Sequence, residues 1–341
     1  MGVRRRIRAA AAPATKTVLL KSGFYSALRT LQPSRKLAIL RYHAICGDEG
    51  HGYADPSICV PPDQFARHVE YLAGHYDVLK LPEAIQALRE GRSLPANAVA
   101  ITFDDGYADN LEAARVLHRH GLSATFYITA GCLAEGEPFW PAEIRALIRS
   151  MSLGRFPLQV NGSCLEIACS SPFERQTAVK LLSGLFKSST IPERERIRRE
   201  LRAIADRPTF ESPMLSWRDV AEMQRLGMTI GAHTLTHPNL PSAGLADAHA
   251  EIAGSRRRLE AELKTPITMF SYPNGGAERY FTPEIRQLAI AAGFEAATTS
   301  WNGFAGPGSD LFALERIQVT PRLEDLVFAL EIERFAFAPE N

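Results

Sequence analysis

The chain has 341 residues, of which 45% are hydrophobic and 23% are charged, and its formal net charge is +1. These average proportions fit an ordinary globular enzyme, and the length allows one barrel with an insertion. No run reaches the ~18 continuous apolar residues of a membrane-spanning helix, so the sequence excludes a span of that kind.

Residues 1–35 form a basic N-terminal segment. Ten Lys or Arg residues precede Asp48, the first acidic residue, which leaves the remainder of the chain acidic. The segment begins with arginines, but Pro13, Lys16 and Lys21 interrupt the apolar stretch that a secretory signal needs. We therefore expect a cytoplasmic protein.

One helical face of this segment is apolar and carries Leu20, Phe24, Leu28 and Leu31. Such a face packs on the bottom of a barrel or lies on a membrane surface. The first alternative makes the helix structural. The second makes the protein peripheral at the inner face of the membrane.

From residue 36 onward, strand-like and helix-like patterns alternate. This alternation implies a parallel sheet, so residues 36–341 are expected to form an α/β fold, a distorted (β/α) barrel of about seven parallel strands with a helical insertion. The expected strands are 37–42, 98–103, 124–129, 228–232, 267–271, 295–299 and 316–320. The expected helices are 64–73, 81–90, 110–120, 216–226, 246–263 and 283–292.

The alternation breaks over about residues 132–215, which we assign to the insertion. Residues 173–186 and 192–205 have the pattern of charged amphipathic helices. Because glutamates interleave the arginines between Glu193 and Glu200, a solvated, salt-bridged face explains this run better than a nucleic-acid site does. The insertion is either a lid or a docking surface for a large substrate, and the sequence does not decide between the two.

The cysteines do not indicate a disulfide framework. They are odd in number and form no C-x-x-C motif, so a reducing compartment fits better. The five are Cys46, Cys59, Cys132, Cys164 and Cys169.

Two adjacent carboxylates, Asp104 and Asp105, follow the expected strand 98–103. Ionised neighbours repel each other unless a cation or a shared proton relieves them. The functional alternatives are a metal ligand beside a general base, or an unequal acid/base pair. The structural alternative is an Asp that caps the helix beginning near Asn110.

Two histidines, His233 and His237, follow the expected strand 228–232. Histidines four apart lie on one face of a helical turn, so both imidazoles can reach one ion. Alone, this spacing is more often surface or core histidine, but Asp104 and Asp105 lie at another strand end of the same barrel face. Two His and one Asp leave a position for water, which is the arrangement of a hydrolytic zinc site.

These motifs resemble those of a known family. Thr102-Phe103-Asp104-Asp105-Gly106 together with His233-Thr234-x-x-His237 is similar to the NodB-type polysaccharide deacetylases, the family-four carbohydrate esterases. The resemblance implies that Asp104 is the catalytic base and that Asp105, His233 and His237 bind one divalent metal. Zinc suits these ligands best, and cobalt, nickel or manganese could occupy them.

The family's third motif resembles Ser271-Tyr272-Pro273-Asn274-Gly275. Ser271 stands where an Arg that orients the base is usual, and Asn274 stands where Tyr is usual. What remains of the motif implies substrate and oxyanion contacts from Tyr272, Pro273 and Asn274. The backbone N–H of Asn274 would then help to stabilise the oxyanion.

The family's late Leu-x-His motif, the source of the general acid, is missing, and Glu315-Arg316-Ile317-Gln318-Val319 occupies the comparable end of the chain. Leu40-Arg41-Tyr42-His43 resembles the Tyr-His element of a circularly permuted branch, in which the acid-bearing strand lies at the front of the barrel. This resemblance makes His43 the acid that protonates the leaving amine. Alternatively His43 caps a loop, and His51 is then the next candidate.

The expected function is a metal-dependent hydrolase that removes acetyl groups from N-acetylated sugars in cell-surface polysaccharide biosynthesis or modification. Its partner would be an N-acetylated sugar, oligosaccharide or glycan intermediate, and no nucleic acid. Two alternatives stay open: an O-acetyl esterase or small-amide hydrolase using the same site, and a non-catalytic carbohydrate-binding protein with a decayed site. Aromatic candidates for stacking on a sugar, or for core packing, are Tyr107, Trp140, Tyr272 and Trp301.

Overall fold

The computed structural model describes residues 13–160, 162–205, 211–275 and 280–336. Within these ranges, seven parallel strands close into a barrel in the order β1-β10-β9-β8-β7-β4-β3, and β3 pairs back to β1. A short strand, β2 (Asp77–Val78), extends the ladder at the start of β3. The barrel strands are β1 (Ala38–Tyr42), β3 (Ala98–Phe103), β4 (Thr125–Ile128), β7 (Thr229–Ala232), β8 (Met269–Ser271), β9 (Ala296–Asn302) and β10 (Leu314–Gln318).

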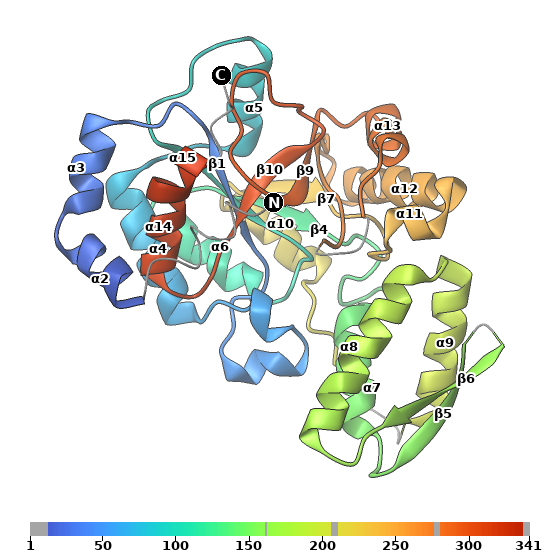
Figure 1. Cartoon of the computed structure of the whole chain (residues 1–341). Helices are drawn as coiled ribbons and strands as arrows, with labels where there is room; N and C mark the ends of the chain where they lie inside the picture. Colours follow the sequence, from blue (N-terminus) through green and yellow to red (C-terminus); the bar gives the residue numbers. More distant parts are fainter. Residues whose placement is uncertain (1–12, 161, 206–210, 276–279, 337–341) are drawn as a thin grey trace.

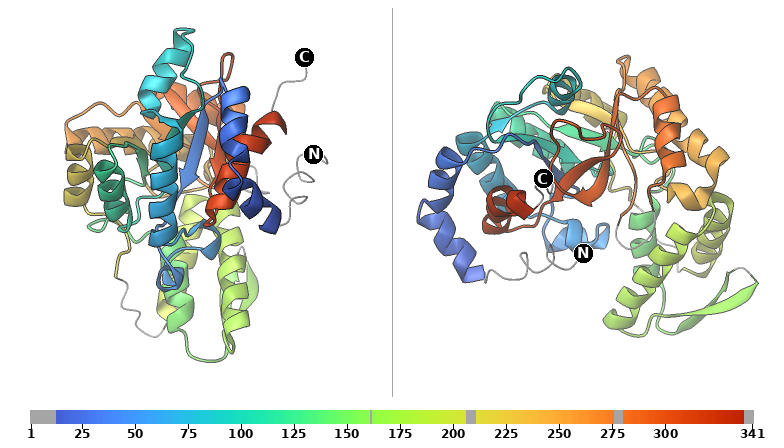
Figure 2. Two further views of the ribbon diagram at one scale, coloured as in Figure 1. Left: turned by 90° about the vertical axis from the view of Figure 1, so that its left-hand side faces the viewer. Right: turned by 45° about the horizontal axis from the view of Figure 1, so that its top comes forward.

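Helices surround the barrel, as Figures 1 and 2 show. Every strand and helix expected for the barrel is present within a few residues, so the predicted (β/α) barrel is confirmed. The α-helices outside the insertion are α2 (Pro13–Lys21), α3 (Phe24–Leu31), α4 (Pro62–His75), α5 (Leu81–Arg89), α6 (Asn110–Arg119), α10 (Trp217–Arg225), α11 (Leu240–Ala243), α12 (Leu245–Leu263), α13 (Pro283–Ala291), α14 (Leu323–Phe328) and α15 (Arg334–Ala336). Shorter or wider turns are η1 (Asp48–Gly52), η2 (Pro56–Ile58) and the π-helical η3 (Ala329–Glu333).

The core is tightly packed under the carboxyl end of β3. All six residues of β3 are buried, as expected for a parallel strand covered on both faces. The ring of Phe103 stacks on Tyr42 and on Phe126, with centroids 5.2 and 4.5 Å apart. This aromatic layer lies directly before Asp104 and Asp105 in the sequence and forms a rigid, packed support for the backbone of the two residues. All five cysteines are free thiols.

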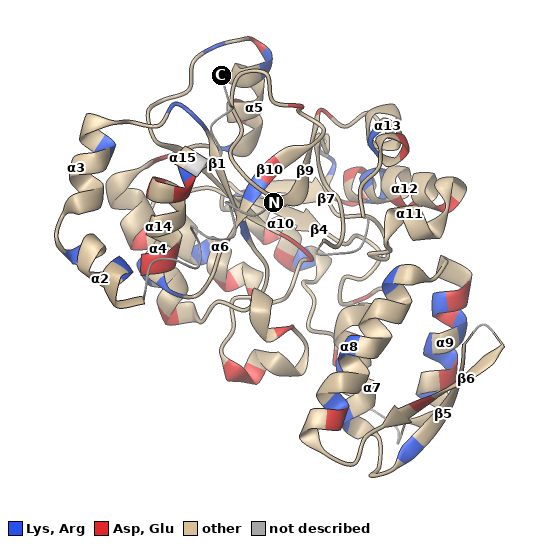
Figure 3. Ribbon diagram, in the orientation of Figure 1, with Lys and Arg blue, Asp and Glu red and all other residues tan. Residues whose placement is uncertain are grey.

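The insertion between β4 and β7 forms a separate lobe beside the barrel (Figure 1). It has its own apolar cluster, which includes Trp140, Leu182 and Ile197. The two helices expected here are present, whereas the first helix and a β-hairpin were not predicted. The charged face of α9 carries alternating signs (Figure 3), and Arg196 pairs there with Glu193 and Glu200. The elements are α7 (Trp140–Ser150), β5 (Arg155–Val160), β6 (Ser163–Ala168), α8 (Pro172–Ser188) and α9 (Ile191–Ile204).

Helices α2 and α3 pack against α14, where Tyr25 is buried with Leu323 and Val327. Phe24 and Leu31, two of the four residues of the expected apolar face, are exposed, so packing against the barrel covers only part of that face. Residues 1–12 of the basic segment lie outside the described residues. None of the described helices is long and apolar enough to cross a membrane.

A buried ion pair explains why α3 does not bury its whole apolar face. Arg29, one helical turn after Tyr25, donates to Glu331 at 2.9 Å, and both side chains are almost fully shielded from water. The hydroxyls of Tyr71 and Tyr76 also accept hydrogen bonds from the Arg29 guanidinium. A buried charge requires such partners, so α3 turns its arginine inward and leaves two apolar residues outside.

Candidate active site

The residues singled out from the sequence meet at the carboxyl ends of the strands. Asp104 and Asp105 follow β3, His233 follows β7 and His43 follows β1. They line one cavity of about 720 Å³, together with His237. A barrel presents its active site at this face, because all parallel strands end there.

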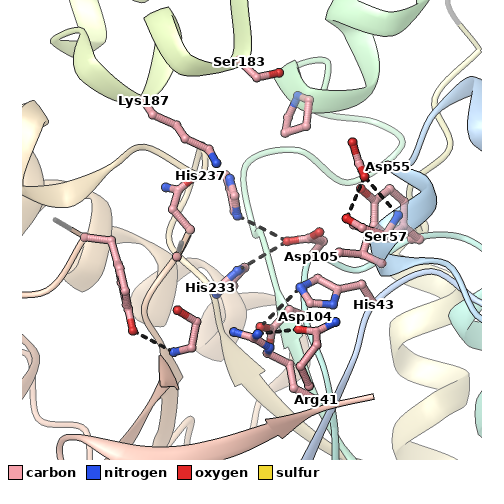
Figure 4. A pocket seen from close by; sticks show the side chains of 18 of the residues that line it. Arg41, His43, Asp55, Ser57, Asp104, Asp105, Ser183, Lys187, His233 and His237 are labelled. Carbon is pink, nitrogen blue, oxygen red and sulfur yellow. Dashed lines mark hydrogen bonds and ion pairs between the residues drawn. The ribbon is translucent and has the colours of Figure 1, made fainter. Parts of the chain in front are cut away.

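Asp105, His233 and His237 form a compact group (Figure 4). One ligand atom from each side chain lies within 4.8 Å of the other two, and all three residues are buried. The Asp105 Oδ1 atom is 3.4 Å from His233 Nε2 and 3.3 Å from His237 Nε2. Burial alone would raise the pKa of Asp105, but hydrogen bonds from the two imidazoles hold it well below its usual range. The group is therefore an anionic carboxylate facing two ring nitrogens.

The two histidines come together on a loop and not on the helical turn that their spacing predicted. Thr234 and His237 have φ angles of 65° and 57°, in the left-handed region that non-glycine residues rarely adopt. Asp105, with a φ of 77°, shares this conformation. Three residues in a costly conformation at one site indicate backbone held for function.

Glu251 on α12 holds this loop in place. Its Oε2 atom accepts hydrogen bonds from the backbone N–H groups of Leu235 and Thr236, both at 2.8 Å. From the insertion, Arg194 donates to the Thr236 hydroxyl at 2.8 Å, and Trp140 donates to the His237 carbonyl at 2.9 Å. The barrel and the insertion thus fix the histidine loop together.

Arg316 on β10 is the main residue that the sequence analysis did not identify. It contacts both oxygens of Asp104, with Nη1–Oδ1 at 2.7 Å and Nη2–Oδ2 at 2.6 Å. Its Nη2 atom also donates to the hydroxyl of Ser271, at 3.1 Å. Ser271 stands where the family usually has the orienting Arg, and here it contacts an arginine that arrives from a different strand.

The electrostatics of Asp104 follow from this contact. Burial alone would raise the pKa of Asp104, but the charge of Arg316 and its hydrogen bonds hold it well below its usual range. Asp104 is therefore ionised at neutral pH. An ionised carboxylate that is held in a fixed orientation beside the group of Asp105, His233 and His237 is suited to act as a general base.

His43 lies on the other side of Asp104, with 3.9 Å between its Nε2 atom and Asp104 Oδ2. Burial lowers the pKa of His43 to about 4, and the nearby carboxylates offset only part of this effect. The imidazole is thus neutral at pH 7. The alternative acid, His51, lies in η1 beside Asp48 and does not line the cavity.

The third motif contributes less than expected. Tyr272 is buried and donates its hydroxyl hydrogen to the carbonyl of Phe312, at 3.0 Å. Neither Tyr272 nor Pro273 lines the cavity, whereas Asn274 does. Asn274 has a φ of 70° and its side chain donates to the carbonyl of Pro238. Of the three substrate-contact candidates, the structure places one at the cavity.

The aromatic candidates divide in the same way. Tyr107 and Trp140 line the cavity but are 1% and 2% exposed, so they form its packed wall. Trp301, at the end of β9, also lines the cavity and is 45% exposed. An exposed indole face is the geometry that stacks on a sugar ring.

A cavity at the carboxyl ends of the barrel strands, with an ionised, oriented carboxylate beside a carboxylate–imidazole group, defines a barrel hydrolase. The polysaccharide deacetylase family model matches residues 91–155 and 188–297, which is half of the chain, and the chain belongs to this family. Members hydrolyse N-acetyl amide bonds, so the protein is an enzyme of that class. The family resemblance of the motifs is confirmed.

Several known proteins are similar to this chain. A protein of Bacillus subtilis (strain 168) whose description reads "Putative polysaccharide deacetylase YxkH" is 23% identical over 308 residues, which is 90% of this chain and 79% of that protein. The structure of the Streptococcus pyogenes deacetylase PplD in complex with acetate has a TM-score of 0.57 at 20% identity and covers 88% of this chain and 100% of PplD. The structure of IcaB from Ammonifex degensii has a TM-score of 0.57 at 18% identity, and the match covers 88% of this chain and 98% of the IcaB chain. These two structures show a shared fold.

Proposed function

We propose that this deacetylase is metal-dependent and acts on N-acetylated sugars of a cell-surface polysaccharide or of its biosynthetic intermediates. The observation that carries the metal dependence is the buried group of Asp105, His233 and His237. The donor set fits an ion, because the Ser271 carbonyl accepts a hydrogen bond from His233 Nδ1 at 2.8 Å. That bond places the ring proton on Nδ1 and leaves the Nε2 lone pair available. Zinc suits these ligands best, with cobalt, nickel and manganese as alternatives.

A divalent ion at such a site supplies an electrophile for the amide carbonyl and lowers the pKa of water. Asp104 accepts the proton of the attacking water as the general base. Arg316 keeps this carboxylate ionised and oriented, so that the base is ready at neutral pH. The backbone N–H of Asn274 donates a hydrogen bond to the developing oxyanion.

His43 delivers a proton to the leaving amine, because an amide nitrogen departs only once it is protonated. Since the imidazole is neutral at pH 7, it must gain that proton within the reaction. Asp104 is the donor, because its low pKa makes it a poor holder of the proton it takes from water. His43 Nε2 and Asp104 Oδ2 are 3.9 Å apart, and contacts of this kind tighten when substrate binds.

The test is acetate release from matched N-acetylated and O-acetylated sugars, oligosaccharides and sugar nucleotides, before and after treatment with a chelator. We expect amide hydrolysis that a chelator abolishes and added zinc restores. Ester hydrolysis with no amide hydrolysis would instead support the O-acetyl esterase. Activity that survives complete metal removal would rule out the proposed metal dependence.

We also propose that helices α2 and α3 contact an anionic membrane surface. Val18, Phe24 and Leu31 are exposed apolar side chains on these helices, and Lys21 lies exposed between them. Apolar groups with neighbouring basic residues are the composition that binds anionic lipid. A substrate linked to lipid would place the enzyme at such a surface.

A further inference from the structure

The charged side chains around the active-site cavity are not all paired. Arg145 forms an ion pair with Asp55 at 2.6 Å, and Arg316 pairs with Asp104. The remaining carboxylate, Asp105, faces the two histidines of the proposed metal site. Two cations that line the cavity, Arg41 and Lys187, have no carboxylate of their own among the residues that the structure describes.

Lys187 comes from the last turn of α8 in the insertion. Figure 4 shows its side chain extending from the insertion toward His237, with Ser183 one helical turn before it. Within the described residues, no hydrogen bond or ion pair engages the Lys187 ammonium group. A lysine in the last turn complements the helix dipole wherever its side chain points. The dipole therefore does not explain why this half-buried side chain points into the cavity.

Arg41 lies on the opposite side of the proposed metal ligands, at the end of β1 (Figure 4). Its guanidinium donates one hydrogen bond to Gln318, and its Nε atom is buried without a partner. Burial, followed by repulsion from Arg316, lowers the pKa of Arg41 to about 10, so it remains charged at neutral pH. The charges of Asp104 and Asp105 offset part of this effect, but neither carboxylate contacts the Arg41 guanidinium directly. A half-buried cation without a contacting anion is stabilised when a ligand supplies one.

We propose that the substrate is an N-acetylated sugar that carries an anionic group next to the sugar ring, and that Lys187 binds this group. Arg41 adds to the positive potential of the cavity. A neutral glycan would supply no anion to either cation, whereas a phosphate ester or a uronate carboxylate would form a charge-assisted hydrogen bond with Lys187. A cavity of about 720 Å³ has room for a sugar and one such substituent.

The sugar ring and the anion take different walls of the cavity. Trp301, at the end of β9 in the barrel, is exposed for stacking, whereas Lys187 reaches the cavity from α8 in the insertion. The insertion therefore contributes the selective contact, while the barrel contributes the catalytic groups. This inference rests on the proposed function, because the metal site sets where the acetamido group lies.

The experiment compares kcat/KM for N-acetylglucosamine 1-phosphate, an N-acetylglucosamine–glucuronate disaccharide and the neutral methyl glycoside. We expect the metal-loaded wild-type enzyme to prefer at least one anionic sugar by about tenfold or more, the size of one charge-assisted hydrogen bond. In Lys187→Ala that preference should fall about tenfold, and Lys187→Arg should retain most of it. Lys180→Ala, on an exposed position of the same helix outside the cavity, is the matched control and should behave like wild type.

A second readout does not need turnover. Binding of glucosamine 1-phosphate and of glucosamine can be followed by calorimetry, and the phosphate should improve affinity in wild type but much less in Lys187→Ala. Turnover and binding with no anionic preference, or a preference unchanged in Lys187→Ala, would overturn the inference. An anionic preference in binding with no acetate release from any N-acetylated sugar would overturn the proposed function and leave the anion site standing.

Discussion

Arg316 on β10 donates two hydrogen bonds to the carboxylate oxygens of Asp104, at 2.7 and 2.6 Å, although it lies 212 residues later in the chain. Both side chains are almost completely buried. A bidentate guanidinium fixes the plane of a carboxylate as well as its charge, which a single ammonium group cannot do. The base of this enzyme is therefore oriented by β10, and Ser271 on β8 contacts the same arginine.

Replacing Arg316 should affect stability and catalysis together. In Arg316→Met, Asp104 becomes a buried charge without a partner, and we expect a loss of about 3–5 kcal/mol in the free energy of unfolding. The exposed pair of Arg286 and Asp310 is the control, since Arg286→Met should cost less than about 1 kcal/mol. Denaturant titration of both variants measures the difference. Equal losses would show that the Arg316 pair contributes no more than a surface pair.

The milder variant Arg316→Lys tests orientation. Lysine keeps the positive charge but cannot form two parallel hydrogen bonds to the carboxylate. We therefore expect kcat to fall by about 10²-fold or more, with metal content unchanged. Because Arg316 lowers the pKa of Asp104, weaker pairing should raise that pKa. The acidic limb of the kcat/KM profile should then move to higher pH. A profile that does not move would mean that Arg316 does not control the ionisation of the base.

Periodic patterns and strand ends were enough to predict most of this fold. The expected strand 98–103 coincides with β3, and the carboxylates after it face the histidines after β7 because parallel strands end at one face. The contacts with Arg316 could not be predicted in this way. An arginine inside a strand has no sequence signal for burial, and its partner lies across the barrel.

Other features were missed for different reasons. The hairpin in the insertion has a recognisable signal in the dipeptide Asn161-Gly162, which favours a two-residue turn. The loop that carries His233 and His237 has no such signal, because its left-handed conformation depends on hydrogen bonds to Glu251, many residues away. Tyr272 belongs to a motif associated with the site, yet its hydroxyl bonds inside the core. Motif membership alone does not decide which side of a strand end a residue faces.

Metal content should separate the two adjacent aspartates. His237→Ala removes a ligand of the proposed ion, so most bound metal and nearly all turnover should be lost while the barrel stays folded. Asp104→Asn should lose turnover but keep the metal, since Arg316 and not the ion is its direct partner. Elemental analysis of both purified variants, with circular dichroism as the folding control, provides the measurement. Equal metal loss would show that the roles of Asp104 and Asp105 are assigned wrongly.

His43 should matter for amides more than for activated esters. An aryl acetate releases a phenolate that needs no proton, whereas an amine leaves only when protonated. His43→Ala should therefore slow N-deacetylation by about 10²- to 10⁴-fold and largely spare the aryl ester, with metal still bound. If both rates fall together, His43 positions the site and another group is the acid.

The pH profile of the wild-type enzyme gives an independent check on His43. A resting acid with the ordinary histidine pKa would cause activity to fall as pH rises through about 6.5. The lowered pKa of His43, about 4, predicts no such fall, because His43 is already neutral in the resting enzyme and receives its proton from Asp104 during the reaction. A loss of kcat/KM near pH 6.5 that is absent from His43→Ala would contradict the proton transfer from Asp104.

Membrane contact can be tested with a matched pair of exposed positions. Phe24→Ser removes an exposed aromatic side chain from α3, and Phe173→Ser removes one from the insertion. Sedimentation with anionic vesicles should weaken in Phe24→Ser and stay unchanged in Phe173→Ser, and salt should weaken binding of the wild type. Hydrolysis of a water-soluble substrate should not change in either variant. Partitioning that neither salt nor Phe24→Ser alters would leave α2 and α3 with a purely structural role.

His68 should make the fold sensitive to acid. Its ring is fully buried, with Nδ1 at 3.2 Å from the hydroxyl of Tyr42, and burial lowers its pKa to about 4. Above the unfolded pKa of about 6.5, both states hold a neutral ring and the stability is fully present. As pH falls from 6.5 to 4, the unfolded chain binds a proton that the folded chain refuses, so stability decreases.

The expected loss between pH 8 and pH 5 from this residue is about 2 kcal/mol, on the scale set by the two pKa values. His68→Gln loses the buried ring and its contact with Tyr42, so it should be less stable than wild type at pH 8. Because glutamine does not titrate, the stability of this variant should depend less on pH. His120→Gln, at the exposed end of α6, is the control and should follow wild type. Because His43 and His237 are also buried with lowered pKa values, the informative quantity is the difference between wild type and His68→Gln. Parallel stability curves for the two proteins would show that His68 is protonated in the folded state as readily as in the unfolded one.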